Sequence, residues 1–157
     1  NIDDDANGYV DDYNGWDFAD SDNDPTADQN DHGTFVSGLS SASTNNSLGI
    51  AGIGYNCKFA PLKVFRSSGG FSFNLYESII YAADEGFDVI NLSWGAVGRY
   101  SQFEQDIINY AVLEKDMVVV AAAGNTNAEL DFYPASYENV LSVANTTEED
   151  VKAPGAT

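Results

Sequence analysis

Short apolar runs rich in valine or isoleucine alternate along this chain with longer segments of helical periodicity. Three such runs, 58–65, 87–92 and 117–122, are continuous enough to predict parallel strands that are buried on both faces. A fourth strand is expected at 140–144.

The segments between these runs predict helices. In 73–85 and 102–115 the apolar residues recur near one helical face, and Gly86 follows the first segment as a stop signal. The small and apolar residues of 32–43 predict a third helix, and its glycines imply that it is tightly packed and buried.

Strands and helices in this alternating order predict an α/β fold with right-handed crossovers and a central parallel sheet flanked by helices. With 157 residues and no linker, the chain is expected to form one domain, 1–157, in which 1–31 is an acidic loop region. Catalytic or binding residues are expected in the loops that follow the strands.

Charge narrows the classes of partner. The chain has 6 basic and 25 acidic residues, a net charge of −19, which would repel nucleic acid and anionic lipid. No apolar run approaches the roughly 20 residues that span a bilayer. Cys57 is the only cysteine, so it excludes an internal disulfide and is expected to be a small core residue.

Eleven aspartates fall within the first 31 residues, and the first of them have the spacing of a calcium-binding loop. Gly8 occupies the sharp-turn position, although Asn14 replaces the acidic residue at position 12. The candidate ligands are Asp3, Asp5, Asn7, Tyr9 and Asp11. The alternative is a solvated acidic loop. Asp20, Asp22 and Asp24 form a weaker candidate, because no glycine lies among them.

His32 is the only histidine, and a histidine considered alone is more often a core or surface residue than a catalytic one. Its surroundings, Asp-His-Gly-Thr-Phe-Val-Ser-Gly over 31–38, resemble the histidine motif of the subtilisin-like serine proteases. In that family the imidazole takes the proton of the serine hydroxyl, a role that suits a neutral imidazole. The resemblance therefore implies that His32 is a general base.

Two further segments resemble the same family. Ala-Ala-Ala-Gly-Asn over 121–125 is similar to its oxyanion segment, which implies that the Asn125 amide faces the developing oxyanion, although Gly-Asn after a strand is usually only a turn. The segment 89–95 resembles its substrate-cleft strand. The implied substrate-binding residues are Ser93, Trp94, Gly95, Ala122, Ala123 and Gly124.

The resemblance extends over nearly the whole chain and implies further features. Phe132 would line the base of the first substrate pocket and shorten it, and the Tyr133-Pro134 peptide bond would be cis. The segment 45–52 resembles the family's strong calcium loop. Its implied ligand residues are Asn46, Leu48 and Ile50.

Other matches are Ala-Pro-Leu-Lys-Val at 60–64 and Val-Lys-Ala-Pro-Gly at 151–155. The acidic opening is similar to an insertion in bacterial members of the family. From the resemblance we expect a subtilisin-like three-layer fold, a bacterial source, secretion or a cell-surface location, and a monomer that binds calcium and a peptide or protein substrate.

Two family motifs are missing from the sequence: the Asp-Thr-Gly or Asp-Ser-Gly strand before the histidine, and the Gly-Thr-Ser-Met-Ala helix start after the oxyanion segment. We therefore expect this chain to be the central portion of a longer catalytic domain and to be inactive alone. The leading hypothesis is a calcium-stabilised serine endopeptidase. The alternatives are an inactive relative that binds peptide or calcium, and an acidic calcium-binding module.

Overall fold

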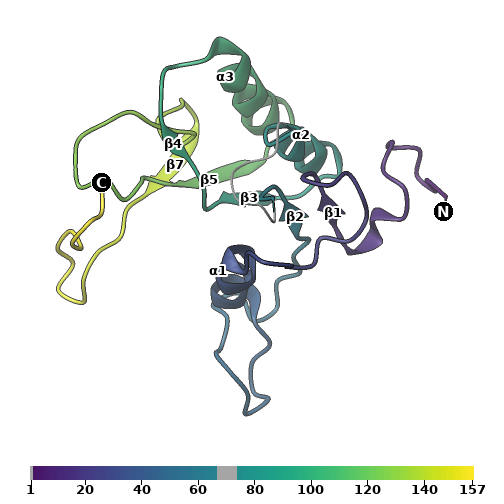
Figure 1. Ribbon diagram of the computed structural model, residues 1–157, viewed down its shortest axis with the longest axis horizontal. Helices are drawn as coiled ribbons and strands as arrows, with labels where there is room; N and C mark the ends of the chain where they lie inside the picture. Colours follow the sequence, from purple (N-terminus) through teal and green to yellow (C-terminus); the bar gives the residue numbers. More distant parts are fainter. Residues whose placement is uncertain (1, 67–73) are drawn as a thin grey trace. The chain divides into compact units, whose positions relative to one another are not determined.

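The computed structural model describes residues 2–66 and 74–157 of the chain, which divides into two compact units, Asn1–Ser78 and Ile79–Thr157. The first unit has one two-stranded sheet, and the second has a three-stranded and a two-stranded sheet (Figure 1).

The first unit is formed mainly by loops around one helix and one pair of strands. Its elements are the 3-10 helix η1 Asp12–Asn14, the strand β1 Trp16–Asp17, the helix α1 His32–Ser41 and the strand β2 Leu62–Lys63. The two strands pair in parallel, with Asp17 opposite Lys63. The apolar run 58–65 thus supplies a strand of only two residues, and its partner comes from the acidic region, where no strand was predicted.

Helix α1 confirms the predicted helix but not its predicted burial. None of its residues is buried, and the side chains of Phe35 and Leu39 are 68% and 64% exposed. The segment after the helix contacts its C-terminal end. There the backbone N–H groups of Ile53 and Gly54 donate to carbonyls of the last turn. A Cβ on Gly52 would lie 2.3 Å from the Ala42 nitrogen. The glycines of the helix itself make no such approach: a Cβ on Gly33 would meet nothing within 4 Å, and one on Gly38 would lie 3.6 Å from Cδ1 of Ile50. The tight packing predicted from these two glycines is therefore not found.

The second unit holds the larger sheet. Its elements in chain order are most of α2 Glu77–Asp84, β3 Val89–Leu92, β4 Ala96–Val97, α3 Gln102–Asn109, the π-helix η2 Tyr110–Glu114, β5 Val118–Ala122, β6 Phe132–Tyr133 and β7 Val140–Val143. Strands β3, β5 and β7 pair in parallel in the order β3-β5-β7. The predicted α/β class with a parallel sheet is confirmed.

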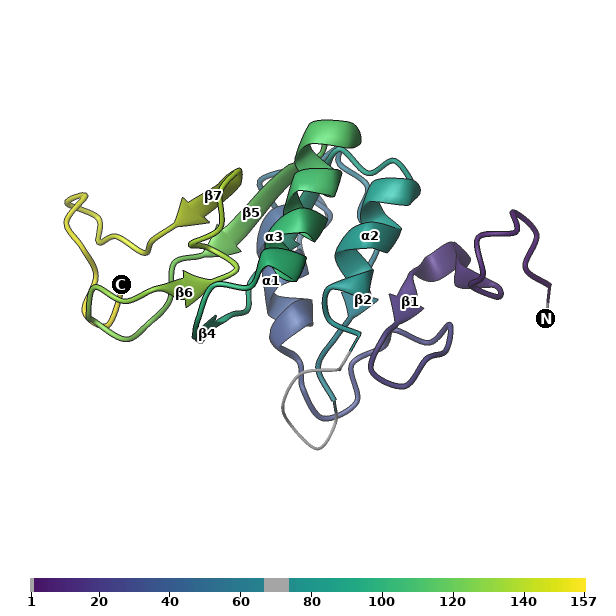
Figure 2. The same ribbon diagram turned by 90° about the horizontal axis from the view of Figure 1, so that it is seen from above.

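The core of the second unit lies between this sheet and the two helices α2 and α3, which lie side by side (Figure 2). Alternate residues of β3 and β5 point into it. Its buried apolar side chains include Ile79, Ile107, Ile108, Ile90, Leu92, Met117 and Val119. Gln105 is the buried polar group of α3, and its amide group hydrogen-bonds the backbone N–H and C=O of Glu138.

The prediction that the strands are buried on both faces is wrong for this unit. Val89 and Val118, which are paired neighbours, are 56% and 49% exposed, and Leu141 of β7 is 58% exposed. Val89 and Val118 alternate with the buried positions of β3 and β5, so they lie on the opposite face of the sheet, and Leu141 pairs with Val120 on that same face. β5 is apolar throughout, whereas β3 and β7 each carry one polar residue, Asn91 and Ser142, and only one face of the sheet packs on the helices of the unit.

The remaining differences concern element ends. The helix predicted at 73–85 begins at Glu77, and residue 73 lies outside the described residues. Gly86 follows it at φ +74°, as a stop signal requires. The segment 102–115 is one α-helix followed by a π-helical turn, in which the Lys115 N–H bonds the Tyr110 carbonyl. Among the described residues, no helix has both the length and the hydropathy needed to cross a bilayer.

Candidate active site

His32 is the first residue of α1 and is exposed. Its backbone N–H donates to the Asn30 side-chain oxygen at 3.1 Å, which satisfies one of the donors that a helix start leaves open. Its imidazole meets the Phe65 ring nearly perpendicularly, with ring centroids 5.8 Å apart. Phe65 follows β2, so the first unit itself fixes one side of the imidazole.

In the second unit, two of the predicted substrate-binding segments follow neighbouring strands. Ser93–Gly95 comes directly after β3, and Ala123–Asn125 comes directly after β5, with Leu92 opposite Ala121 in the register. Because the strands are parallel, both segments leave the same edge of the sheet, where parallel α/β proteins commonly bind ligands. The structure thus brings together the two segments that the sequence places 30 residues apart.

Local hydrogen bonds hold both segments. The Asn91 amide donates to the Ser93 hydroxyl at 2.8 Å, and the Ala123 N–H donates to the Val143 carbonyl of β7 at 2.9 Å. Gly124 has φ +109°, a conformation that favours glycine, and its carbonyl accepts from the Thr157 N–H. Asn125 follows this turn and is exposed.

Phe132 lies between the two segments. A Cβ on Gly95 would lie 2.4 Å from Cε1 of this ring, and a Cβ on Gly124 would lie 3.0 Å from its Cγ and Cδ2. The strand pair β4–β6 holds Phe132 opposite Val97, and the Ser136 hydroxyl accepts from the Phe132 N–H at 3.0 Å. The Tyr133-Pro134 peptide bond is cis, as predicted. The ring therefore occupies the space that two glycines leave beside Asn125.

The predicted calcium loop does not gather its oxygens around one point. Both carboxylate oxygens of Asp3 accept loop N–H groups, from Asn7 and Gly8, and Asp5 accepts from Asn7. The Asn7 amide turns its nitrogen, not its oxygen, toward Asp5 and Asp12. Over residues 2–66 and 74–157, no three His, Cys, Asp or Glu side chains are placed to hold one metal ion.

The other candidate ligands are likewise engaged with their own loops. The Asn46 side-chain oxygen accepts from the Leu48 N–H at 3.0 Å. Asp22 accepts from the Asp24 N–H, and hydrogen bonds from the Thr26 hydroxyl and N–H hold the pKa of Asp24 below its usual value. Carboxylate and amide oxygens are ligands of the kind that calcium prefers, but their arrangement here does not fit a formed calcium site.

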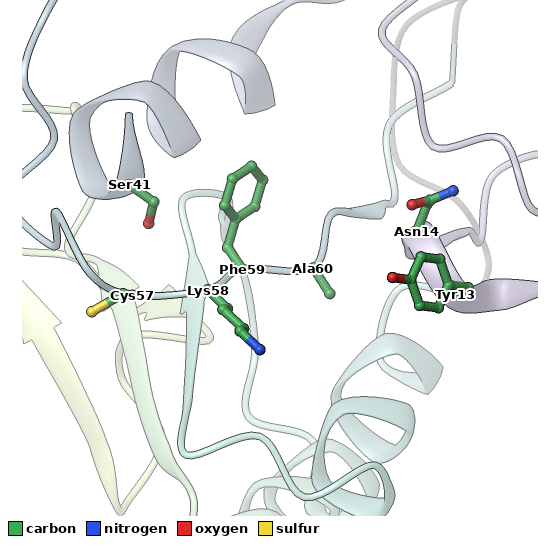
Figure 3. Close-up of a pocket in the computed structure, with 7 residues that line it drawn as sticks. All are labelled: Tyr13, Asn14, Ser41, Cys57, Lys58, Phe59 and Ala60. Carbon is green, nitrogen blue, oxygen red and sulfur yellow. The ribbon is translucent and has the colours of Figure 1, made fainter. Parts of the chain in front are cut away.

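The first unit also contains an open cavity of about 570 Å³ (Figure 3). None of the predicted site residues lines it. Its lining residues are Tyr13, Asn14, Ser41, Cys57, Lys58, Phe59 and Ala60. Cys57 is exposed here, so the expectation that it is a core residue is wrong.

Two residues near His32 were not predicted from the sequence to take part in the site. They are Phe65, whose ring contacts the imidazole, and Lys63 of β2, whose ammonium lies 3.2 Å from Oδ2 of Asp28, four residues before His32. One signal was present: Lys63 is one of only 6 basic residues and lies within an apolar run, where a cation requires acidic partners.

Comparison with known proteins finds a family that this chain matches. Residues 1–156 match the model of the subtilase family, Peptidase S8. The chain is 44% identical over 137 residues to a thermophilic serine proteinase of Bacillus sp. (strain AK1), and 42% identical over 140 residues to thermitase of Thermoactinomyces vulgaris. These alignments cover 87% and 88% of this chain but 33% and 49% of the relatives, so the chain spans between a third and a half of their length.

A solved structure agrees with this match. The psychrophilic subtilisin-like protease from the Antarctic psychrotroph Pseudoalteromonas sp. AS-11 aligns with a TM-score of 0.74 and 31% identity, over 83% of this chain and 30% of that one. Others among the matched relatives are named as extracellular proteases.

Proposed function

Because this chain belongs to the subtilase family, we propose that it is part of a serine endopeptidase that hydrolyses peptide bonds by acyl transfer. The observation that carries the proposal is the shared sheet edge at which Ser93–Gly95 and Ala123–Asn125 leave β3 and β5. An extended peptide beside the first segment would place its scissile carbonyl near the second. We propose that both compact units belong to one peptidase domain.

In the proposed reaction, a serine hydroxyl attacks the scissile carbonyl carbon and His32 takes the hydroxyl proton. The carbonyl oxygen becomes an oxyanion, which accepts a hydrogen bond from the Asn125 side-chain amide. Return of the proton to the amine allows the C–N bond to break, and water repeats the sequence on the acyl-enzyme. The family motifs that would carry the serine and the orienting aspartate are not found in this sequence, so the proposal places both residues in a longer polypeptide.

The substrate in this proposal is a peptide or protein bound by strand addition, with backbone pairing along Ser93, Trp94 and Gly95. The acidic surface gives no support for nucleic acid as a partner. Secretion or a cell-surface location is proposed by analogy with the relatives named as extracellular proteases. A bacterial source and a monomeric state are proposed from the resemblance alone.

The proposal is tested with the product of the complete gene and a library of fluorogenic peptides. A peptidase releases fluorophore with saturation kinetics, and binding by fluorescence anisotropy gives the same peptide preferences. An inactive peptide-binding relative, which is the alternative, gives the anisotropy signal without hydrolysis. If no peptide of the library were bound or hydrolysed, this outcome would contradict both the peptidase and the inactive peptide-binding relative.

The position of Phe132 predicts a preference for small side chains in the subsite between Gly95 and Gly124, because the ring fills the space that a large side chain would need. Phe132→Gly is expected to raise kcat/KM for a peptide with phenylalanine at that position by about 10- to 100-fold, the range that hydrophobic pocket contacts supply. The matched control is kcat/KM for a peptide with alanine at that position, which should change little. A wild-type preference for large aromatic side chains would contradict the prediction.

Calcium binding remains a proposal that rests on the spacing of Asp3, Asp5, Asn7 and Asp11. Because the Asn7 amide faces the carboxylates with its nitrogen, binding requires this amide to turn. We expect calcium at 100 times its Kd to raise the free energy of unfolding by about 2.7 kcal/mol. Thermal unfolding with calcium and with a chelator measures it.

Two substitutions with the same change in charge separate a calcium site from general screening. Asp5→Ala removes a proposed ligand and is expected to abolish the calcium-dependent rise in melting temperature. Asp4→Ala removes an exposed neighbour outside the ligand spacing and should retain it. Equal responses of the two variants would instead favour a solvated acidic loop.

A further inference from the structure

Lys63 lies among three carboxylates of the first unit. Its ammonium nitrogen is 2.7 Å from Asp17 Oδ2, 3.2 Å from Asp28 Oδ2 and 3.6 Å from Asp20 Oδ2. The Lys63 side chain is 14% exposed, and that of Asp17 is 2% exposed. This ion pair is thus largely withdrawn from water, unlike the surface pair of Lys115 with Asp84, whose side chains are 34% and 47% exposed.

Asp17 uses both carboxylate oxygens. Oδ1 accepts from the N–H groups of Ala19 at 2.7 Å and Asp20 at 3.0 Å, while Oδ2 faces the ammonium. The hydrogen bond to Asp17 holds the pKa of Lys63 above its usual range, so the ammonium stays charged throughout the neutral range. A buried carboxylate that lost this cation would be left uncompensated, which is costly.

The three carboxylates belong to the segment 17–28, which leads from β1 to the start of α1. Asp28 lies only four residues before His32. Lys63 is the last residue of β2, and Phe65 follows two residues later. The Phe65 ring meets the His32 imidazole with ring centroids 5.8 Å apart and ring planes at 83°. The Lys63 side chain therefore links the segment that precedes His32 to the strand whose continuation contacts the imidazole.

We propose that Lys63 is a positioning residue for His32: its ammonium fixes the segment ending at Asp28 against β2, and β2 presents Phe65 to the imidazole. A general base must lie within hydrogen-bond reach of the proton that it takes, and a displacement of about 1 Å can lower the rate about 100-fold. This inference rests on the proposed role of His32 as the base, but its first test does not require activity.

The test uses the imidazole resonances of His32 in the product of the complete gene, identified as the signals that His32→Ala removes; His32 is the only histidine of the 157 residues. The ring current of Phe65 displaces the His32 carbon-bound protons from the position of an unstructured histidine. Phe65→Leu should abolish this displacement and so defines the signature. Lys63→Met should lose most of it, whereas Lys63→Arg, which keeps the charge, should retain it.

The matched control is Lys115→Met, which breaks the exposed ion pair with Asp84 in the other unit and should leave the His32 signals in place. A folded Lys63→Met protein with wild-type His32 signals would overturn the proposal. If Lys63→Met does not fold, Asp28→Asn decides the question, because Asp28 is an exposed partner; it should move the same signals in the same direction, and unmoved signals would overturn the proposal.

A kinetic measurement on the product of the complete gene distinguishes the two proposals. Lys63→Met is expected to lower kcat for peptide hydrolysis about 10- to 100-fold with KM unchanged, and Lys63→Arg should restore it. Displaced His32 signals with an unchanged kcat would mean that Lys63 positions the imidazole but that His32 is not the base. Unmoved signals together with an active enzyme would leave the proposed function intact and remove Lys63 from it.

Discussion

Replacing His32 with alanine in the product of the complete gene is expected to lower kcat for peptide hydrolysis about 10⁶-fold. The imidazole is the proposed acceptor of the hydroxyl proton and the donor to the leaving amine, so its removal takes away both proton transfers. KM should change little, because the imidazole does not hold the peptide. The measurement is steady-state hydrolysis of a fluorogenic peptide, with circular dichroism to verify the fold.

Because His32 lies at the start of α1, His32→Ala should leave the backbone of the helix undisturbed. The helix start keeps its bond from the residue 32 N–H to Asn30, because that bond uses the backbone, and the imidazole itself is exposed. The variant should therefore fold as the wild type does. A His32→Ala protein that kept more than about a hundredth of the wild-type kcat would remove the imidazole from the mechanism.

Replacing Asn125 with alanine is expected to lower kcat about 10²- to 10³-fold, which corresponds to about 2.7 to 4 kcal/mol of transition-state stabilisation. The amide follows the Gly124 turn at the end of β5, beside the segment proposed to hold the peptide. Its hydrogen bond forms only as the carbonyl oxygen gains charge, so KM should stay near the wild-type value.

Asn127 provides the matched control for this prediction. It has φ 53°, a left-handed conformation that glycine adopts without strain, so Asn127→Gly removes a neighbouring amide without disturbing the backbone. This variant should keep the wild-type kcat. Equal losses at both asparagines would indicate a disturbed loop rather than a lost oxyanion donor.

The sheet of the second unit could be predicted because its strands are apolar runs separated by amphipathic helices. β5 begins one residue later than the run 117–122, and β3 begins two residues later than the run 87–92. Met117 contributes to the core although it precedes its strand. Hydrophobic pattern therefore predicts which residues enter the core better than it predicts where backbone pairing begins.

Two-residue strands could not be predicted in this way. β1 lies in an acidic loop region with no apolar run, and it pairs with β2, whose register partners are 46 residues away in the sequence. This register places Asp17 and Lys63, which form the ion pair, side by side. β4 and β6 are equally short, and their pairing fixes Phe132. Such pairs depend on contacts between distant residues, which local periodicity does not encode.

The candidate site, too, could be predicted from the sequence only in part. The segments 93–95 and 123–125 could be placed from strand order, since parallel strands end at one edge of a sheet. The cis bond before Pro134 followed from the family resemblance and is confirmed. The contact of Phe65 with His32 could not be predicted, because it depends on how β2 passes the start of α1.

The central claim is that this chain belongs to an active serine peptidase, and labelling by a fluorophosphonate probe, read by intact mass, tests it most directly. The probe reacts with activated serine hydroxyls, so the product of the complete gene is predicted to have a mass above 16.9 kDa and to gain one adduct, which His32→Ala should prevent. A folded product of the complete gene that gains no adduct would contradict the claim.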